Sequence, residues 1–185
     1  MKECTSRTAA AVIIGNELLN GKIEERNVVV LARVLRTLGI ALRRIVVVPD
    51  EVPTIVQEIR SLSAAFDLVF TSGGVGPTHD DVTVEAVAQA FDTCVQVHEP
   101  TAEMIRRHFG DRLTPGHLLM ARVPQGCTLV TDEMVQWPTI VMRNVWVLPG
   151  VPEIFHKRLG MMKRHLAGAE PFVCRVVHTR LDEGN

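Results

Sequence analysis

The glycine-rich segment from Thr71 to Thr83, with the sequence TSGGVGPTHDDVT, holds the residues of this chain best suited to chemistry. Three glycines in such a turn let the backbone approach a ligand closely, and free backbone N–H groups there favour anions. The adjacent carboxylates of Asp80 and Asp81 can serve as metal ligands or as acid and base groups. The segment therefore predicts a site for a phosphorylated ligand.

Each part of this segment has a predicted role. Hydroxyl groups and backbone groups of the loop are expected to contact phosphate or the polar edges of a ligand. The candidate residues for these contacts are Ser72, Gly73, Gly74, Gly76, Pro77 and Thr78. One of Asp80 and Asp81 is expected to cap the helix that follows, since carboxylates suit helix N-termini. The other is expected to help hold a divalent metal, and Asp81 is the stronger candidate.

The elements that must position these residues alternate between apolar strands and amphipathic helices. The patterns predict strands at 9–14, 45–48 and 68–70, and helices at 27–38, 52–65 and 81–91. In the second helix, Val56, Ile59 and Leu62 are expected to face inward. This alternation predicts an α/β fold with a mostly parallel sheet covered on both faces. Ligands bind such sheets at the carboxyl ends of the strands, where Asn16, Glu17 and the glycine segment should converge.

The second half of the chain is less regular. A helix is predicted at 100–109 and a mostly irregular loop at 110–126, because the latter contains Pro115, Gly116, Pro124 and Gly126. Strands at 139–142 and 145–148 are expected to form a hairpin. A helix at 152–166 and a strand at 172–177 complete the prediction.

Bulk properties limit the classes of function. The 185 residues fit one domain spanning 1–185, and the formal net charge of -1 argues against nucleic-acid or anionic-membrane binding. The four cysteines have no metal-binding spacing. No signal peptide or membrane span is expected, so the sequence predicts a cytoplasmic protein that binds a small molecule.

Four segments in order resemble the molybdopterin-binding domain family, which includes MoaB/Mog-like proteins and the N-terminal domain of CinA-type proteins. These segments are IGNELLNG from Ile14, VVPDEV from Val47, GGVGPTHDDVT from Gly73 and NVWVLPGVPE from Asn144. The chain looks most like the domain that precedes the synthase in eukaryotic FAD synthases. The resemblance implies a three-layer α/β/α sandwich.

The resemblance also implies roles for individual residues. MoaB/Mog-like relatives have an essential aspartate where Asp81 stands, whereas Asp80 matches only the CinA and FAD-synthase branches. Pro149 and Gly150 are expected to line the pocket from the side opposite the glycine loop. Asn27 either contacts the ligand or caps its helix. Relatives commonly form dimers or trimers, so a homo-oligomer is expected, and a C-terminal appendage usual in the family is expected to be missing.

Two departures from the family pattern bear on activity. Most relatives have an aspartate where this chain has Asn16, and an amide cannot act as a base and is a poorer Mg²⁺ ligand. Glu17 beside it is either functional or a solvated carboxylate. The stretch 137–141 lacks the glycine-rich turn of CinA-type proteins, which favours flavin nucleotides as substrates.

The leading hypothesis is a nucleotide pyrophosphatase that acts on FAD or ADP-ribose with Mg²⁺, Mn²⁺ or Co²⁺ and needs no bound organic cofactor. In this hypothesis Asp81 and Asp80 hold the metal, and Asn16 and Asn27 orient the substrate. One alternative is adenylyl transfer to molybdopterin. Another is a module that binds molybdopterin or a nucleotide without catalysis, as the loss of a carboxylate at Asn16 would allow. Synthesis of FAD and deamidation of a pyridine nucleotide need further domains and are not expected.

Overall fold

A six-stranded sheet forms the centre of the protein in the computed structural model, which describes residues 6–132, 137–166 and 172. The strand order is β2-β1-β3-β8-β7-β6, in which the first four strands are parallel, β7 runs antiparallel to β8, and β6 runs antiparallel to β7. The strands are β1 (Thr8–Ile14), β2 (Ala41–Val48), β3 (Leu68–Ser72), β6 (Thr128–Val130), β7 (Thr139–Met142) and β8 (Val145–Leu148). The predicted parallel sheet and the predicted hairpin are confirmed.

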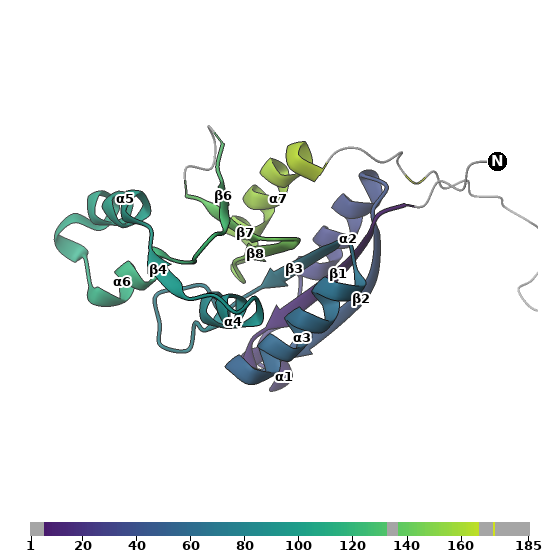
Figure 1. The fold of residues 1–185 in the computed structure, drawn as a ribbon, viewed down its shortest axis with the longest axis horizontal. Helices are drawn as coiled ribbons and strands as arrows, with labels where there is room; N and C mark the ends of the chain where they lie inside the picture. The colour runs from purple at the N-terminus through teal and green to yellow at the C-terminus, as the bar shows by residue number, and fades with distance from the viewer. Residues whose placement is uncertain (1–5, 133–136, 167–171, 173–185) are drawn as a thin grey trace, which may run out of the picture.

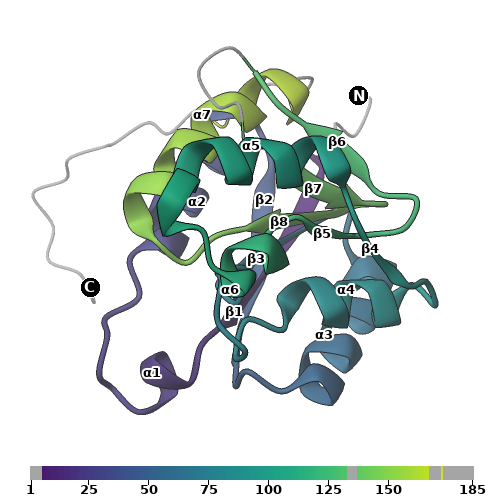
Figure 2. The same cartoon turned by 90° about the vertical axis from the view of Figure 1, so that its left-hand side faces the viewer.

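Helices cover both faces of this sheet (Figures 1 and 2). Helices α2 (Asn27–Thr37) and α7 (Pro152–Leu166) pack on one face, and α3 (Val52–Ala65) and α4 (Thr83–Ala90) pack on the other. Alternate residues of β1 enter the two cores: Ala9 and Ala11 face α2 and α7, while Ala10 and Val12 face α3 and α4. The result is the expected three-layer α/β/α sandwich.

Proline fixes the starts of several helices. Pro53 lies in the first turn of α3, and Pro152 is the first residue of α7. Proline suits these positions because it lacks an N–H group that the helix would leave unpaired anyway. Both helices have the bounds expected from the sequence. The inward face of α3 differs slightly, because Ile55 is fully buried whereas Val56 is only partly buried.

A small lobe stands at the end of the sheet toward which the parallel strands point (Figure 1). It contains the antiparallel pair β4 (Val95–Val97) and β5 (Arg122–Pro124), helix α5 (Glu99–Phe109), a 3-10 turn at Gly110–Arg112 and helix α6 (Pro115–Leu119). Its own core is formed by Ala102, Ile105 and Ala121. The prediction of a mostly irregular loop at 110–126 was therefore wrong, and neither β4 nor β6 was expected.

Helix α4 begins at Thr83 rather than at Asp81, so neither aspartate caps it. The strand expected at 172–177 lies, apart from Phe172, outside the described residues. Among the described helices, none has both the length and the hydropathy that a membrane span requires.

Candidate functional site

The candidate site is a cavity of about 860 Å³ at the carboxyl ends of β1, β3 and β8. Its wall contains all the sequence-predicted site residues except Asn16, Thr78 and Asp80. The predicted residues that line it are Glu17, Asn27, Ser72, Gly73, Gly74, Gly76, Pro77, Asp81, Pro149 and Gly150. The structure thus brings the end of the first strand, the glycine loop and the Pro149–Gly150 turn together.

The glycine loop is packed so closely that side chains at two positions would collide with its neighbours. Gly73 has φ +108°, and a Cβ there would lie 2.1 Å from the carbonyl oxygen of Ile14. Gly74 has φ +65°, and a Cβ there would lie 2.3 Å from Oγ1 of Thr83. Thr83 itself is fully buried, and its hydroxyl donates to the Gly73 carbonyl at 2.8 Å. The packing of the loop therefore requires glycine at these two positions.

Asn27 ties three parts of the site together. It is only 3% exposed, and its Nδ2 donates to Ser72 Oγ at 3.0 Å and to the Gly150 carbonyl at 2.8 Å. Its Oδ1 is buried and has no hydrogen-bond partner among the described residues. The side chain does not cap α2, whose Val28 N–H instead donates to Glu25 Oε1. Asn27 thus holds the glycine loop and the Pro149–Gly150 turn at a fixed separation.

The two aspartates of the loop occupy different positions. Asp81 lines the cavity, and its Oδ2 accepts hydrogen bonds from the Thr78 N–H at 2.9 Å and the Thr78 hydroxyl at 2.5 Å. These bonds close a turn ahead of α4, which explains why the helix starts two residues later than expected. Asp80 is exposed, and its Oδ1 lies 2.9 Å from Nε2 of His79. Asp81 is the aspartate that faces the cavity.

Asn16 and Asp50 meet at the edge of the site. The Asn16 N–H donates to Asp50 Oδ2 at 2.8 Å, while Asn16 itself is exposed and does not line the cavity. Partial burial raises the pKa of Asp50, with a further rise from the charges of Glu17, Asp80 and Asp81 and an opposing effect of the Asn16 hydrogen bond. Negative charge therefore accumulates on this side of the site.

Asp50 was not among the predicted site residues. Its position immediately after the second strand, within the segment VVPDEV, is the signal that points to it. Side chains that follow neighbouring parallel strands gather at one edge of a sheet.

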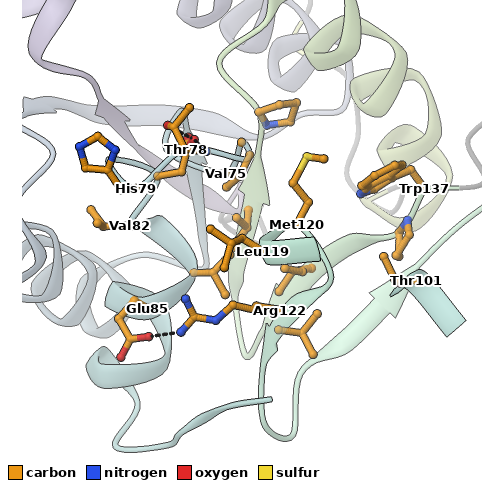
Figure 3. A pocket seen from close by; sticks show the side chains of 18 of the residues that line it. Val75, Thr78, His79, Val82, Glu85, Thr101, Leu119, Met120, Arg122 and Trp137 are labelled. Atoms are coloured by element: carbon orange, nitrogen blue, oxygen red, sulfur yellow. Dashed lines mark hydrogen bonds and ion pairs between the residues drawn. The ribbon is translucent and has the colours of Figure 1, made fainter. Parts of the chain in front are cut away.

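A second, smaller cavity of about 220 Å³ adjoins the first on the side of the lobe (Figure 3). Thr78, Leu119 and Arg122 contribute to its wall, and Arg122 pairs with Glu85 at 2.8 Å. Residues common to both cavities mark their boundary; these are Val75, Gly76, Asp81, Met120, Trp137, Pro149 and Arg158.

Arg158 is the basic residue at this boundary, and it was not predicted from the sequence. Its side chain is buried, with a residue exposure of 8%, and Nη1 donates to the Pro138 carbonyl at 2.8 Å and to Thr139 Oγ1 at 2.5 Å. Burial lowers the pKa of Arg158 to about 10. The guanidinium is therefore still charged at neutral pH.

Comparisons with known proteins identify the family and the fold of this chain. The family described as "Probable molybdopterin binding domain" matches residues 10–166. A "Probable FAD synthase" of Caenorhabditis elegans is 30% identical over 96% of this chain and 39% of that protein. The crystal structure of the protein CinA, "with unknown function", from Thermoplasma acidophilum has a TM-score of 0.79 and 32% sequence identity, covering 87% of this chain and 98% of that chain.

A more distant structure shares the fold alone. The tungsten cofactor synthesizing protein MoaB from Pyrococcus furiosus has a TM-score of 0.57 and 19% identity, over 88% of this chain and 93% of that chain. The present chain spans between 39% and 64% of the length of the curated relatives that it matches.

Proposed function

Because this chain belongs to the molybdopterin-binding domain family, matched over residues 10–166, we propose that its larger cavity binds a phosphorylated nucleotide-like or pterin-like compound. The observation that carries the proposal is the cavity of about 860 Å³ bordered by the glycine loop. That volume lies within the range of small-molecule sites. A close-packed glycine loop between a strand and a helix presents backbone N–H groups that suit phosphate oxygens.

We further propose that the site hydrolyses the pyrophosphate bond of FAD or ADP-ribose with the help of Mg²⁺, Mn²⁺ or Co²⁺. Such a cation, when bound, offsets phosphate charge and lowers the pKa of an attacking water. Among the described residues, no group of three or more His, Cys, Asp or Glu side chains is placed to hold a metal. A site with only one or two carboxylates still fits Mg²⁺, because this ion is commonly bound by one or two carboxylates together with substrate phosphates and water.

Asp81 is the residue of this chain best placed for that role. Both of its hydrogen bonds with Thr78 fall on Oδ2, which leaves Oδ1 for another partner. Thr78 thereby fixes the orientation of the carboxylate at the boundary of the two cavities. Asp80 pairs with His79 and lines neither cavity, so its part in metal binding is secondary in this proposal.

The replacement Asp81→Asn tests the proposal, because an amide oxygen can still accept the Thr78 hydrogen bonds but provides no charge. With FAD or ADP-ribose and a divalent cation, we expect kcat/KM to fall by about 100-fold or more, as for other losses of electrostatic stabilisation at a reacting centre. Chromatography of the released mononucleotides measures turnover. Asp80→Asn is the matched control, for which we expect a smaller effect. Hydrolysis by Asp81→Asn at the rate of the unmodified protein would contradict the proposal.

A second candidate function is ligand binding without catalysis. Asn16 favours this function, because it replaces the aspartate of most relatives. Asn16 is also exposed and lies outside both cavities. In this case FAD would bind, as measured by the quenching of its fluorescence, and would be recovered intact with each of the three cations.

A further inference from the structure

Arg158 is a buried cation that the described protein does not neutralise. Its Nη1 bonds only neutral oxygens, those of Pro138 and Thr139, and its Nε is buried without a partner. Among the described residues, no carboxylate forms an ion pair with it. Arg122, on the wall of the small cavity, differs from Arg158 in that it pairs with Glu85.

An uncompensated buried charge is costly, because the guanidinium loses its hydration without gaining an opposite charge. Arginine cannot escape this cost at neutral pH by losing its proton. Buried charges in proteins are therefore normally paired, and an unpaired one in the wall of a cavity indicates an anionic ligand.

The location of Arg158 shows where that anion would lie. Arg158 lines both cavities, as do Gly76 of the glycine loop and Asp81. An anion at this boundary would have open volume on two sides: about 860 Å³ on one side and about 220 Å³ on the other.

We propose that Arg158 binds an anionic group of the ligand at the boundary of the two cavities, and that the smaller cavity receives a second organic group attached to that anion. The inference rests on the proposed function in requiring a phosphorylated ligand, but it does not require hydrolysis. It identifies the ligand as a phosphate compound with organic groups on both sides, rather than a monoester with one.

The walls of the small cavity suit an organic group. Val82, Leu119, Val123 and Ile140 provide apolar surface, and the paired side chains of Glu85 and Arg122 provide polar atoms at one side (Figure 3). Because Glu85 already neutralises Arg122, the part of the small cavity that these two side chains line does not need a second anion. A ring or sugar with a few polar atoms fits this surface.

Calorimetric titration with inorganic pyrophosphate tests the role of Arg158, with Mg²⁺ at one concentration for all variants. We expect Arg158→Met to weaken binding at least about 10-fold, the effect of losing a charge-assisted hydrogen bond. Arg158→Lys should lose less, since it keeps the charge but not the fork of donors. Arg164→Met is the matched control, because Arg164 lies on the same helix with an exposed side chain that pairs with Asp132. Equal affinity in Arg158→Met and the unmodified protein would overturn the inference.

The variant Thr139→Val separates the charge of Arg158 from its contacts within the protein. Thr139→Val removes one of the two groups that hold the guanidinium but leaves its charge in place. We expect this variant to keep its pyrophosphate affinity within about 3-fold, and its Tm to rise on addition of pyrophosphate as in the unmodified protein. In Arg158→Met that rise should be absent. If the Tm of Arg158→Met rose as far as that of the unmodified protein, the anion would not depend on this residue.

Leu119→Trp tests the second part of the inference, because Leu119 lines only the small cavity and is 40% exposed. The larger ring should fill that cavity, so we expect FAD to bind at least about 10-fold more weakly while pyrophosphate binds as before. Unchanged FAD affinity would overturn the assignment of the small cavity. The hydrolysis assay on Asp81→Asn is independent of these measurements, so failure of the proposed chemistry and failure of this inference can be told apart.

Discussion

Among single residues, Asp50 shows how the site accumulates negative charge. Partial burial is the main reason why its pKa is raised, and the carboxylates of Glu17, Asp80 and Asp81 add to the effect. The folded protein therefore binds the Asp50 proton more tightly than the unfolded chain does. This group contributes stability when protonated, and the contribution is lost as the pH rises from the ordinary Asp value of 3.8 through the raised pKa.

We predict that Asp50→Asn changes the pH dependence of stability. The amide oxygen can still accept the Asn16 N–H but carries no charge, so the variant should gain stability relative to the unmodified protein as the pH rises from the ordinary Asp pKa of 3.8 through the raised pKa of Asp50. Urea unfolding at several pH values measures this difference. Asp111→Asn, at an exposed position in the lobe, serves as control. A difference between Asp50→Asn and the unmodified protein that stays constant with pH would contradict the prediction.

The burial of Arg158 could not be predicted from the pattern of residues in its helix. An arginine in an amphipathic helix usually marks the solvated face, and neither its type nor its spacing reveals that it is buried. Its burial follows from the packing of α7 beside Pro138 and Thr139, about twenty residues earlier in the chain. Asn27, by contrast, was predicted from the family resemblance, although its bonds to Ser72 and Gly150 were not foreseen.

At the scale of elements, the loop between β3 and α4 depends on contacts with β1 and β8 as well as with the start of α4 itself. The Gly73 N–H donates to the Leu148 carbonyl at 3.2 Å, and the Thr83 N–H donates to the Gly74 carbonyl at 3.0 Å. With the Ile14 carbonyl beside Gly73, these contacts join the ends of β1, β3 and β8 to the start of α4.

We predict that Gly73→Ala is far more damaging than Gly110→Ala. Both glycines have positive φ values, +108° and +51°, but a Cβ at Gly110 meets nothing within 4 Å. Gly110→Ala should cost about 1–2 kcal/mol in the free energy of unfolding, from backbone strain alone. Gly73→Ala adds a collision with backbone and should cost about 3 kcal/mol or more. Urea unfolding measures both; similar values would show that the loop relaxes around the added methyl group.

Elements differed in how well they could be predicted, for physical reasons. Helices α3 and α7 are long, have periodic apolar residues and carry proline in their first turn, so local sequence determines their bounds. Helix α6 has five residues, and it is held by a capping box of Thr114 and His117 and by stacking of His117 on Phe109. Strands β4 and β5 have three residues each and exist because they pair with one another. Such short elements carry too little periodicity for prediction.

At the scale of the whole molecule, two separate hydrophobic cores share one sheet. Leu35 of α2 belongs to one core and Leu62 of α3 to the other, and both are fully buried. The three-layer arrangement was predictable because runs such as Ala9–Ile14 are apolar throughout, as expected for parallel strands buried on both faces.

We predict that Leu35→Ala and Leu62→Ala each lower the free energy of unfolding by about 2–5 kcal/mol, since both create a cavity in a closed core. Val29→Ala, at a residue that is 50% exposed, should change it by no more than about 0.5 kcal/mol. Urea unfolding followed by circular dichroism measures all three variants. If either leucine variant had a negligible effect, the helix layer that contains this leucine would not take part in the cooperative unfolding of the protein.

The strand order has a consequence for how the protein is made. The glycine loop follows β3, yet its neighbour β8 and the Gly150 carbonyl that accepts from Asn27 come much later, and Gly150 is separated from Asn27 by 123 positions in the sequence. A ribosome releases the chain from its N-terminus, so the loop emerges long before the strand that fixes it. Pairings between such distant segments form slowly. The nascent chain therefore exposes an incomplete site until β8 has been released, and only then can the cavity form.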